Sequence, residues 1–97
     1  SRDFTFVSNV VQANLLAMKS EKRFVIYNVG SGESHTLKEA IQIISEISGI
    51  KIEPTYVPQK NQRIKHTLAD ISKIKEELGY DPKYDLKKGL QMMWDSL

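Results

Sequence analysis

The stretch RFVIYNVG at residues 23–30 constrains the fold of this chain more than any other part of its sequence. Residues 24–27 form an apolar run without polar alternation, and the turn-forming sequence GSG follows at residues 30–32. This character is typical of a strand that helices cover on both faces, as in a parallel sheet. We therefore expect residues 24–29 to form a sheet strand, and this chain does not provide all the neighbours that such a strand needs.

Two further segments have the character of strands. RDFTFV at residues 2–7 is a short β-prone run, and KIEPTYVP at residues 51–58 is again extended. Pro54 indicates an edge position for the second segment, because proline cannot donate a hydrogen bond to a neighbouring strand.

Helices are expected between and after these strands. Ser8 or Asn9 can cap the first helix, in which Val11, Leu15 and Met18 recur at helical spacing. In the second helix, Thr36 and Glu39 have the spacing of a capping box, and Gly49 is the expected stop. The expected buried face of this second helix is made of Leu37, Ala40, Ile41, Ile44 and Ile47.

The last two helices follow a basic loop. Asp70 is the expected cap of the third helix, which should stop at Gly79, and Asp85 is the expected cap of the fourth. The fourth helix carries one apolar stripe, made of Leu86, Leu90, Met93, Trp94 and Leu97. The element order predicts an α/β domain of about three strands and four helices.

The overall composition excludes several classes of function. A net charge of +2 is too small to indicate nucleic acid or a membrane surface as the partner, and no apolar run approaches the length of a membrane span. The absence of cysteine excludes thiolate chemistry and fits a cytoplasmic protein, and two distant histidines make a poor metal site. The chain begins within an expected strand and without methionine, so we expect a piece of a longer protein.

No catalytic residue is expected within these 97 residues. The sequence lacks both glycine-rich phosphate-binding fingerprints, and VGSGES is interpreted as a tight turn between a strand and a helix. Two Tyr-x-x-x-Lys spacings occur, Tyr56 with Lys60 and Tyr84 with Lys88. Proline interrupts the first pair, and the expected start of the last helix falls inside the second. Neither pair can therefore occupy one helical face.

The segment PQKNQRIKHT at residues 58–67 gathers Lys60, Arg63, Lys65 and His66. Such a segment is commonly a solvated loop. The alternative is an anion site, because the segment follows an extended run and leads into a helix N-terminus, where positive groups can converge. Arg2, before the first expected strand, is a further candidate for the same anion, and its guanidinium suits two-pronged contact with phosphate oxygens.

Three stretches, SRDFTFVSNVVQANLLA, YNVGSGESHTLKEAI and KHTLADISKIKEELGYDPKYDLKKGL, resemble the carboxy-terminal third of extended short-chain dehydrogenases that act on nucleotide sugars. Of these, the UDP-N-acetylglucosamine 4-epimerase group is the most similar. The resemblance implies that residues 1–97 are the substrate-binding region of a Rossmann-type enzyme. It also implies that NAD and the catalytic Tyr-x-x-x-Lys belong to an absent N-terminal domain, that the fragment alone is inactive, and that the parent protein is a cytoplasmic homodimer.

The resemblance also implies roles for single residues. Arg2 would reach the diphosphate of a UDP-sugar, and Lys60 stands where the family commonly has an arginine that contacts phosphate. Arg63 replaces an aspartate that contacts ribose, and a guanidinium cannot accept hydrogen bonds from hydroxyl groups. Arg63 therefore joins the diphosphate cluster, or the nucleotide differs, or the activity is lost. His66 matches the family motif, and Thr67 would line the sugar pocket or merely satisfy backbone groups.

Three functions are compatible with these residues. The first is the nucleotide-sugar-binding part of an NAD-dependent C4 epimerase. The second is a non-catalytic scaffold or partner-binding module with the same fold, which the substitution at Arg63 favours. The third is a 4,6-dehydratase or reductase, because the absent domain decides the chemistry.

Overall fold

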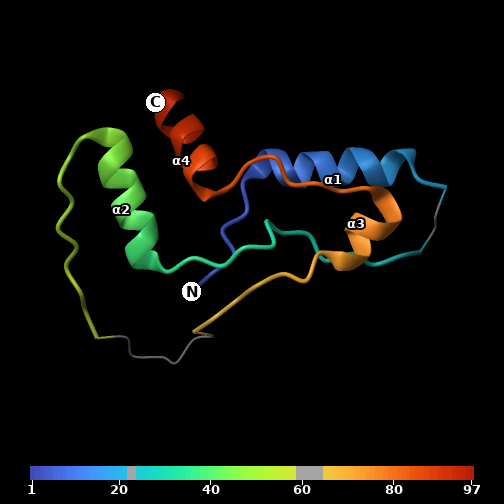
Figure 1. The fold of residues 1–97 in the computed structure, drawn as a ribbon, viewed down its shortest axis with the longest axis horizontal. Helices are drawn as coiled ribbons and strands as arrows, with labels where there is room; N and C mark the ends of the chain where they lie inside the picture. Colours follow the sequence, from blue (N-terminus) through green and yellow to red (C-terminus); the bar gives the residue numbers. More distant parts are fainter. Residues whose placement is uncertain (22–23, 59–64) are drawn as a thin grey trace.

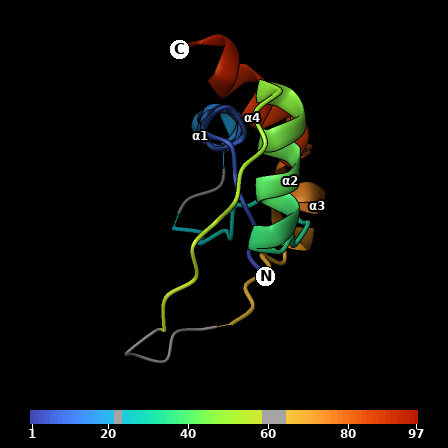
Figure 2. The same cartoon turned by 90° about the vertical axis from the view of Figure 1, so that its left-hand side faces the viewer.

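The regular elements of the described residues are four helices. The computed structural model describes residues 1–21, 24–58 and 65–97. Helices α1 and α3 lie at one end of the molecule, and α2 lies beside α4 at the other end (Figures 1 and 2). Irregular segments connect the two ends. The bounds of the helices are Val7–Lys19 for α1, Leu37–Ser48 for α2, Ser72–Leu78 for α3 and Leu86–Asp95 for α4.

The prediction of three strands was wrong for this chain. Within the described ranges the backbone pairing of strand type is one isolated antiparallel bridge between Arg2 and His35. Residues 24–29 and 51–58 belong to no strand. A strand is held by hydrogen bonds to a neighbour, and the apolar run at residues 24–29 has no ladder partner here. Phe24 is fully exposed and Ile26 is 85% exposed, whereas Tyr27 and Val29 are partly buried against the core.

Two helices begin where the sequence predicted. Thr36 accepts a hydrogen bond from the Glu39 amide at the start of α2, over 3.1 Å. Asp85 accepts one from the Lys88 amide at the start of α4, over 2.8 Å. Each bond satisfies one of the amides that the first turn of a helix leaves free.

Two helices also end where the sequence predicted. Gly49 ends α2 with a φ of 71°, and Gly79 ends α3 with a φ of 70°. Glycine has no Cβ and enters this left-handed region without steric cost, so it is the usual residue at a helix C-terminus.

The expected caps of the other two helices were wrong. Helix α1 begins at Val7, and its N-cap Phe6 makes no side-chain cap bond. Asn9 lies inside this helix and is fully buried. Asp70 precedes the N-cap of α3, and its carboxylate accepts hydrogen bonds from the amide and hydroxyl of Ser72.

The main core joins α1 to α3. Tyr80 is 1% exposed, and its hydroxyl donates a hydrogen bond of 2.7 Å to the carbonyl of Gly30. The other members of this buried cluster are Ala13, Ile71 and Ile74, with Leu16, Tyr27, Val29, Ala69 and Leu78 packed around them. The apolar stripe expected on the first helix is therefore not its buried face, because Val11, Leu15 and Met18 are all exposed.

The chain is extended for its size. Its radius of gyration is 16.0 Å, whereas a compact domain of this length has about 12.5 Å. Its accessible surface is 7789 Å², whereas a compact monomer of 11.1 kDa exposes roughly 5,650 Å². The exposed residues 51–58 run back along the outer side of α2 in Figure 1 and then extend beyond it. None of the helices in the described ranges combines the length and the hydropathy of a membrane-spanning segment.

Candidate functional site

The first residues of the chain lie between two segments that are distant in the sequence. The backbone of Arg2 exchanges two hydrogen bonds of 2.8 Å with His35. On the other side, the carbonyl of Ser1 accepts a 3.0 Å bond from the Thr67 amide, and the Asp3 amide donates to the Thr67 hydroxyl over 3.3 Å. The backbone nitrogen of Ser1 also donates to the carbonyl of Lys65 over 2.7 Å. Arg2 is therefore held beside the end of the basic segment.

The structure brings together three of the five residues predicted to bind substrate. Arg2 is half-buried, and its Nη1 donates a 2.9 Å bond to the carbonyl of Ser1. His66 Nδ1 lies 2.9 Å from the hydroxyl of Ser1, and the amide of Thr67 donates to the carbonyl of Ser1. Lys60 and Arg63 lie outside the described residues. The proposed roles of all five residues stay predictions.

Asp3 organises this region. Its Oδ1 accepts hydrogen bonds from the Ser31 amide over 3.0 Å, from the Ser31 hydroxyl over 2.5 Å, and from the Thr5 hydroxyl over 3.3 Å. Its Oδ2 accepts hydrogen bonds from the Gly32 amide over 3.1 Å and from the Ala69 amide over 3.2 Å. One carboxylate thus joins the N-terminal segment, the Gly-Ser-Gly turn and the segment that leads into α3.

These hydrogen bonds keep Asp3 ionised. Burial raises the pKa of Asp3, but the hydrogen bonds from Ser31 and from two further backbone amides outweigh burial and lower the pKa below its ordinary value. The charge acts on its surroundings in turn. Burial raises the pKa of Tyr80, and the negative charge of Asp3 raises it further.

The glycines of the turn make this close approach possible. A Cβ on Gly30 would lie 2.6 Å from the Cβ of Ala69 and 2.7 Å from Oδ2 of Asp3. Gly32 has a φ of 78°, and a Cβ there would lie 2.8 Å from Cδ1 of Ile71. The backbone of VGSGES bends at Gly30 and Gly32, and the amides of Ser31 and Gly32 bind a carboxylate of the same chain, but the strand predicted before this turn is absent.

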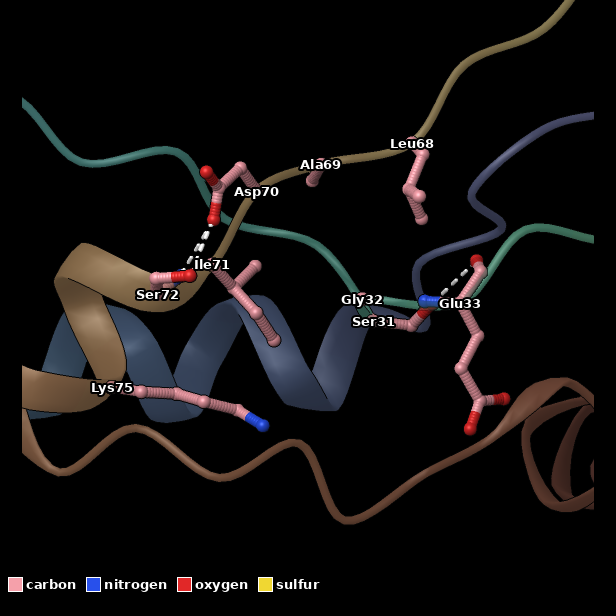
Figure 3. Close-up of a pocket in the computed structure, with 9 residues that line it drawn as sticks. All are labelled: Ser31, Gly32, Glu33, Leu68, Ala69, Asp70, Ile71, Ser72 and Lys75. Atoms are coloured by element: carbon pink, nitrogen blue, oxygen red, sulfur yellow. Dashed lines mark hydrogen bonds between the residues drawn. The ribbon is translucent and has the colours of Figure 1, made fainter.

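A cavity of about 430 Å³ lies beside this turn, between residues 31–33 and the start of α3. In Figure 3, Ile71 points from the start of α3 toward the turn, and Lys75 extends along the lower wall. Asp70 bonds to Ser72 on the opposite side (Figure 3). The lining mixes acidic, basic and apolar side chains, so it does not favour one class of ligand.

His35 carries a second charged cluster next to the bridge with Arg2. Its Nδ1 lies 2.9 Å from the Glu39 carboxylate, and its Nε2 lies 3.4 Å from that of Glu33. The hydrogen bond to Glu39 raises the pKa of His35, burial opposes the shift, and the contact with Glu33 adds to it. The imidazole is therefore protonated more readily than a free histidine.

Two residues of this framework were missed by sequence reasoning. The sequence places Asp3 only within the short run RDFTFV and offers Asn9 only as a possible helix cap. Asn9 Oδ1 accepts hydrogen bonds from the amides of Lys83 and Tyr84 over 3.0 and 3.2 Å, and its Nδ2 donates to the Tyr84 carbonyl over 2.8 Å. The partners of Asn9 are 74 and 75 residues away, and those of Asp3 reach 66 residues away, so no local pattern identifies them.

The described residues offer no built site for a metal, since they contain no group of three metal-ligating side chains. The Gly-Ser-Gly turn also does not fit the NAD that the resemblance implies. The amides of the Gly-Ser-Gly turn already bind the Asp3 carboxylate, so this turn cannot also hold a cofactor phosphate.

Comparisons with known proteins agree with the proposed resemblance. Residues 1–93 match the family model described as GDP-mannose 4,6 dehydratase. A putative UDP-glucose 4-epimerase of Methanocaldococcus jannaschii is 33% identical over 94% of this chain and 29% of its own length. The chain therefore spans less than a third of that relative.

Solved structures share the fold. A UDP-glucose 4-epimerase of Thermotoga maritima, solved with UDP-glucose, matches with a TM-score of 0.88 and 34% identity, covering 96% of this chain and 30% of that one. A UDP-glucuronic acid 4-epimerase of Bacillus cereus, solved with UDP-glucuronic acid and NAD, matches with a TM-score of 0.86 and 27% identity over the same shares. The chain belongs to the GDP-mannose 4,6 dehydratase family, within the extended short-chain dehydrogenases.

Proposed function

We propose that residues 1–97 are the carboxy-terminal, substrate-binding region of an NAD-dependent nucleotide-sugar C4 epimerase, here called the parent enzyme. The observation that carries the proposal is the position of Arg2, whose backbone is held against His35 on one side and whose neighbour Ser1 is bound to Lys65 and Thr67 on the other. The guanidinium of Arg2 and the amide of Thr67 both bond to the carbonyl of Ser1, so the guanidinium lies beside the described end of the basic segment. Such a group suits a diphosphate, which carries several anionic oxygens.

The catalytic groups and the NAD site would lie in the part of the parent enzyme outside residues 1–97. Tyr84 precedes the N-cap of α4, and the Lys88 amine lies 5.2 Å from the centre of its ring without a hydrogen bond between the two side chains. This pair therefore lacks the arrangement needed for proton transfer. We expect the isolated chain to be inactive and to bind nucleotide weakly at best. Tight binding of NAD by the isolated chain would contradict this division of labour.

The exposed surface supports a second domain. The accessible area exceeds that of a compact monomer of this mass by about 2,100 Å². Large apolar side chains contribute to it, among them Phe24 and Ile26 before the turn and Met18 at the end of α1. Such exposed apolar area favours packing against further protein. The homodimeric state and the cytoplasmic location of the parent enzyme stay predictions.

A 4,6-dehydratase is the second candidate, because the matching family model carries the name of that activity. The two reactions give different products from one nucleotide sugar. Incubating the parent enzyme with UDP-glucose and NAD should give UDP-galactose if it is a 4-epimerase that accepts this sugar. A 4-keto-6-deoxy product would instead show a dehydratase.

The role of Arg2 is tested by titrating UDP into the parent enzyme in a calorimeter. The variant Arg2→Ala should bind UDP about tenfold or more weakly, because a hydrogen bond to a charged group contributes roughly 1.5–3 kcal/mol. The control is Lys87→Ala, which removes an exposed positive charge from α4. Equal affinities of the wild type and Arg2→Ala would remove Arg2 from the site.

A further inference from the structure

The carboxylate of Asp3 connects the segments that carry Arg2 and Thr67, two of the proposed binding residues. It follows Arg2 directly, and it accepts five hydrogen bonds from Thr5, Ser31, Gly32 and Ala69. The amide of Asp3 itself donates to the hydroxyl of Thr67. Three segments that carry or flank the predicted binding residues therefore meet at one side chain.

We propose that Asp3 is a positioning residue that holds Arg2 and Thr67 in the orientation that binds the substrate diphosphate. The inference rests on the proposed function, since it assigns Asp3 a role in the same site. Asp3 acts through its neighbours, because both of its carboxylate oxygens are already occupied by donors of the chain itself.

The geometry requires an ionised aspartate at this position. An asparagine has a single side-chain oxygen, and its NH₂ group would face amides that need an acceptor, such as those of Gly32 and Ala69. A glutamate is one methylene longer, and Oδ2 already lies 2.7 Å from the Cβ position of Gly30. Overpacking of this kind forces the backbone to shift. Both substitutions should therefore displace the segment that carries Arg2.

The test uses the parent enzyme and compares Asp3→Asn, Arg2→Ala and the double variant with the wild type. Asp81→Asn is the matched control, because Asp81 is an exposed carboxylate paired with Lys83. The measurements are the dissociation constants of UDP and of NAD, the KM and kcat of the reaction, and the thermal midpoint. All constants are measured well below the midpoint of each variant, so that only folded protein is compared.

A positioning role predicts a specific pattern. Asp3→Asn should weaken UDP binding about tenfold and raise KM similarly, while NAD affinity and kcat stay within about twofold of the wild type. The double variant should bind UDP more tightly than the two single effects combined would predict, because the part of the Asp3 effect that acts through Arg2 is already lost in Arg2→Ala. Asp81→Asn should change none of these values.

Different outcomes would overturn different claims. A lower thermal midpoint for Asp3→Asn with unchanged UDP affinity would show a purely structural role and overturn the inference. Additive effects of Asp3→Asn and Arg2→Ala would also overturn it. Unchanged UDP affinity in Arg2→Ala would instead refute the proposed contact of Arg2 with the diphosphate.

A milder variant keeps the test decisive if Asp3→Asn does not fold. Ser31→Ala removes one of the five donors and leaves the backbone donors in place. It should weaken UDP binding about threefold without changing NAD affinity. Unchanged UDP affinity in a folded Ser31→Ala protein would overturn the inference.

Discussion

Replacing Asn9 by alanine should loosen the connection between α1 and the segment before α4. Asn9 is fully buried, and its amide makes three hydrogen bonds to the backbone of Lys83 and Tyr84. Alanine removes all three hydrogen bonds. The amides of Lys83 and Tyr84 then lack an acceptor, and the carbonyl of Tyr84 lacks a donor. The methyl group of alanine cannot replace any of these hydrogen bonds, because it has neither a donor nor an acceptor.

The expected cost follows from these three groups. A buried backbone group that loses its partner costs about 1–3 kcal/mol. These bonds are partly buried, so we take the lower end for each and expect about 3 kcal/mol in total. That loss corresponds to roughly a hundredfold change in the equilibrium between closed and open states.

Hydrogen–deuterium exchange of the parent enzyme measures this opening directly. In Asn9→Ala, the amides of Lys83 and Tyr84 should exchange about a hundredfold faster than in the wild type. Gln12→Ala is the matched control, because Gln12 lies on the same helix and accepts a 3.1 Å bond from the Asp81 amide at an exposed position. The control should change exchange by less than about fivefold. Equal exchange at residues 83–84 in both variants would refute the reasoning.

Three further predictions concern the glycine turn, the histidine cluster and a helix cap. Gly30→Ala should destabilise the parent enzyme by about 1–3 kcal/mol through overpacking against the Asp3 carboxylate and should weaken UDP binding. A Cβ at Gly49 meets no atom within 4 Å, so Gly49→Ala should cost only about 1 kcal/mol of left-handed strain and leave UDP binding unchanged. Equal UDP affinities of the Gly30→Ala and Gly49→Ala variants would contradict this contrast. The pKa of His35 is raised above 6.5, so its stabilising contribution is complete below pH 6.5 and is lost as pH rises through the folded pKa. His35→Gln should therefore lower the thermal midpoint more at pH 5.5 than at pH 8.5, and an equal loss at both values would argue against the cluster. Asp85→Ala removes the cap of α4 and should cost about 1 kcal/mol in urea unfolding, whereas no loss would show that the cap bond is not stabilising.

The parts of the fold that the sequence predicted depend on neighbours within a few residues. The cap at Thr36 bonds an amide three residues later, and the left-handed ends at Gly49 and Gly79 are set by the residue itself. Such signals are complete within one helical turn. The helix boundaries at these points were therefore predictable.

The predictions that were wrong concern residues whose partners are distant in the sequence. Residues 24–29 have the composition of a buried strand, but a strand forms only beside another strand, and the described residues contain none. The exposure of Val11 and Leu15 has the same origin, because spacing identifies an apolar stripe without identifying what covers it. Asp3 and Asn9 were missed because their partners come from other segments of the chain.

A crystal structure of the parent enzyme with UDP tests the central claim most directly. The claim predicts that the guanidinium of Arg2 lies within hydrogen-bonding distance, about 3 Å, of an oxygen of the diphosphate, with residues 65–67 beside the same nucleotide. A diphosphate bound elsewhere, with Arg2 turned away from it, would contradict the account.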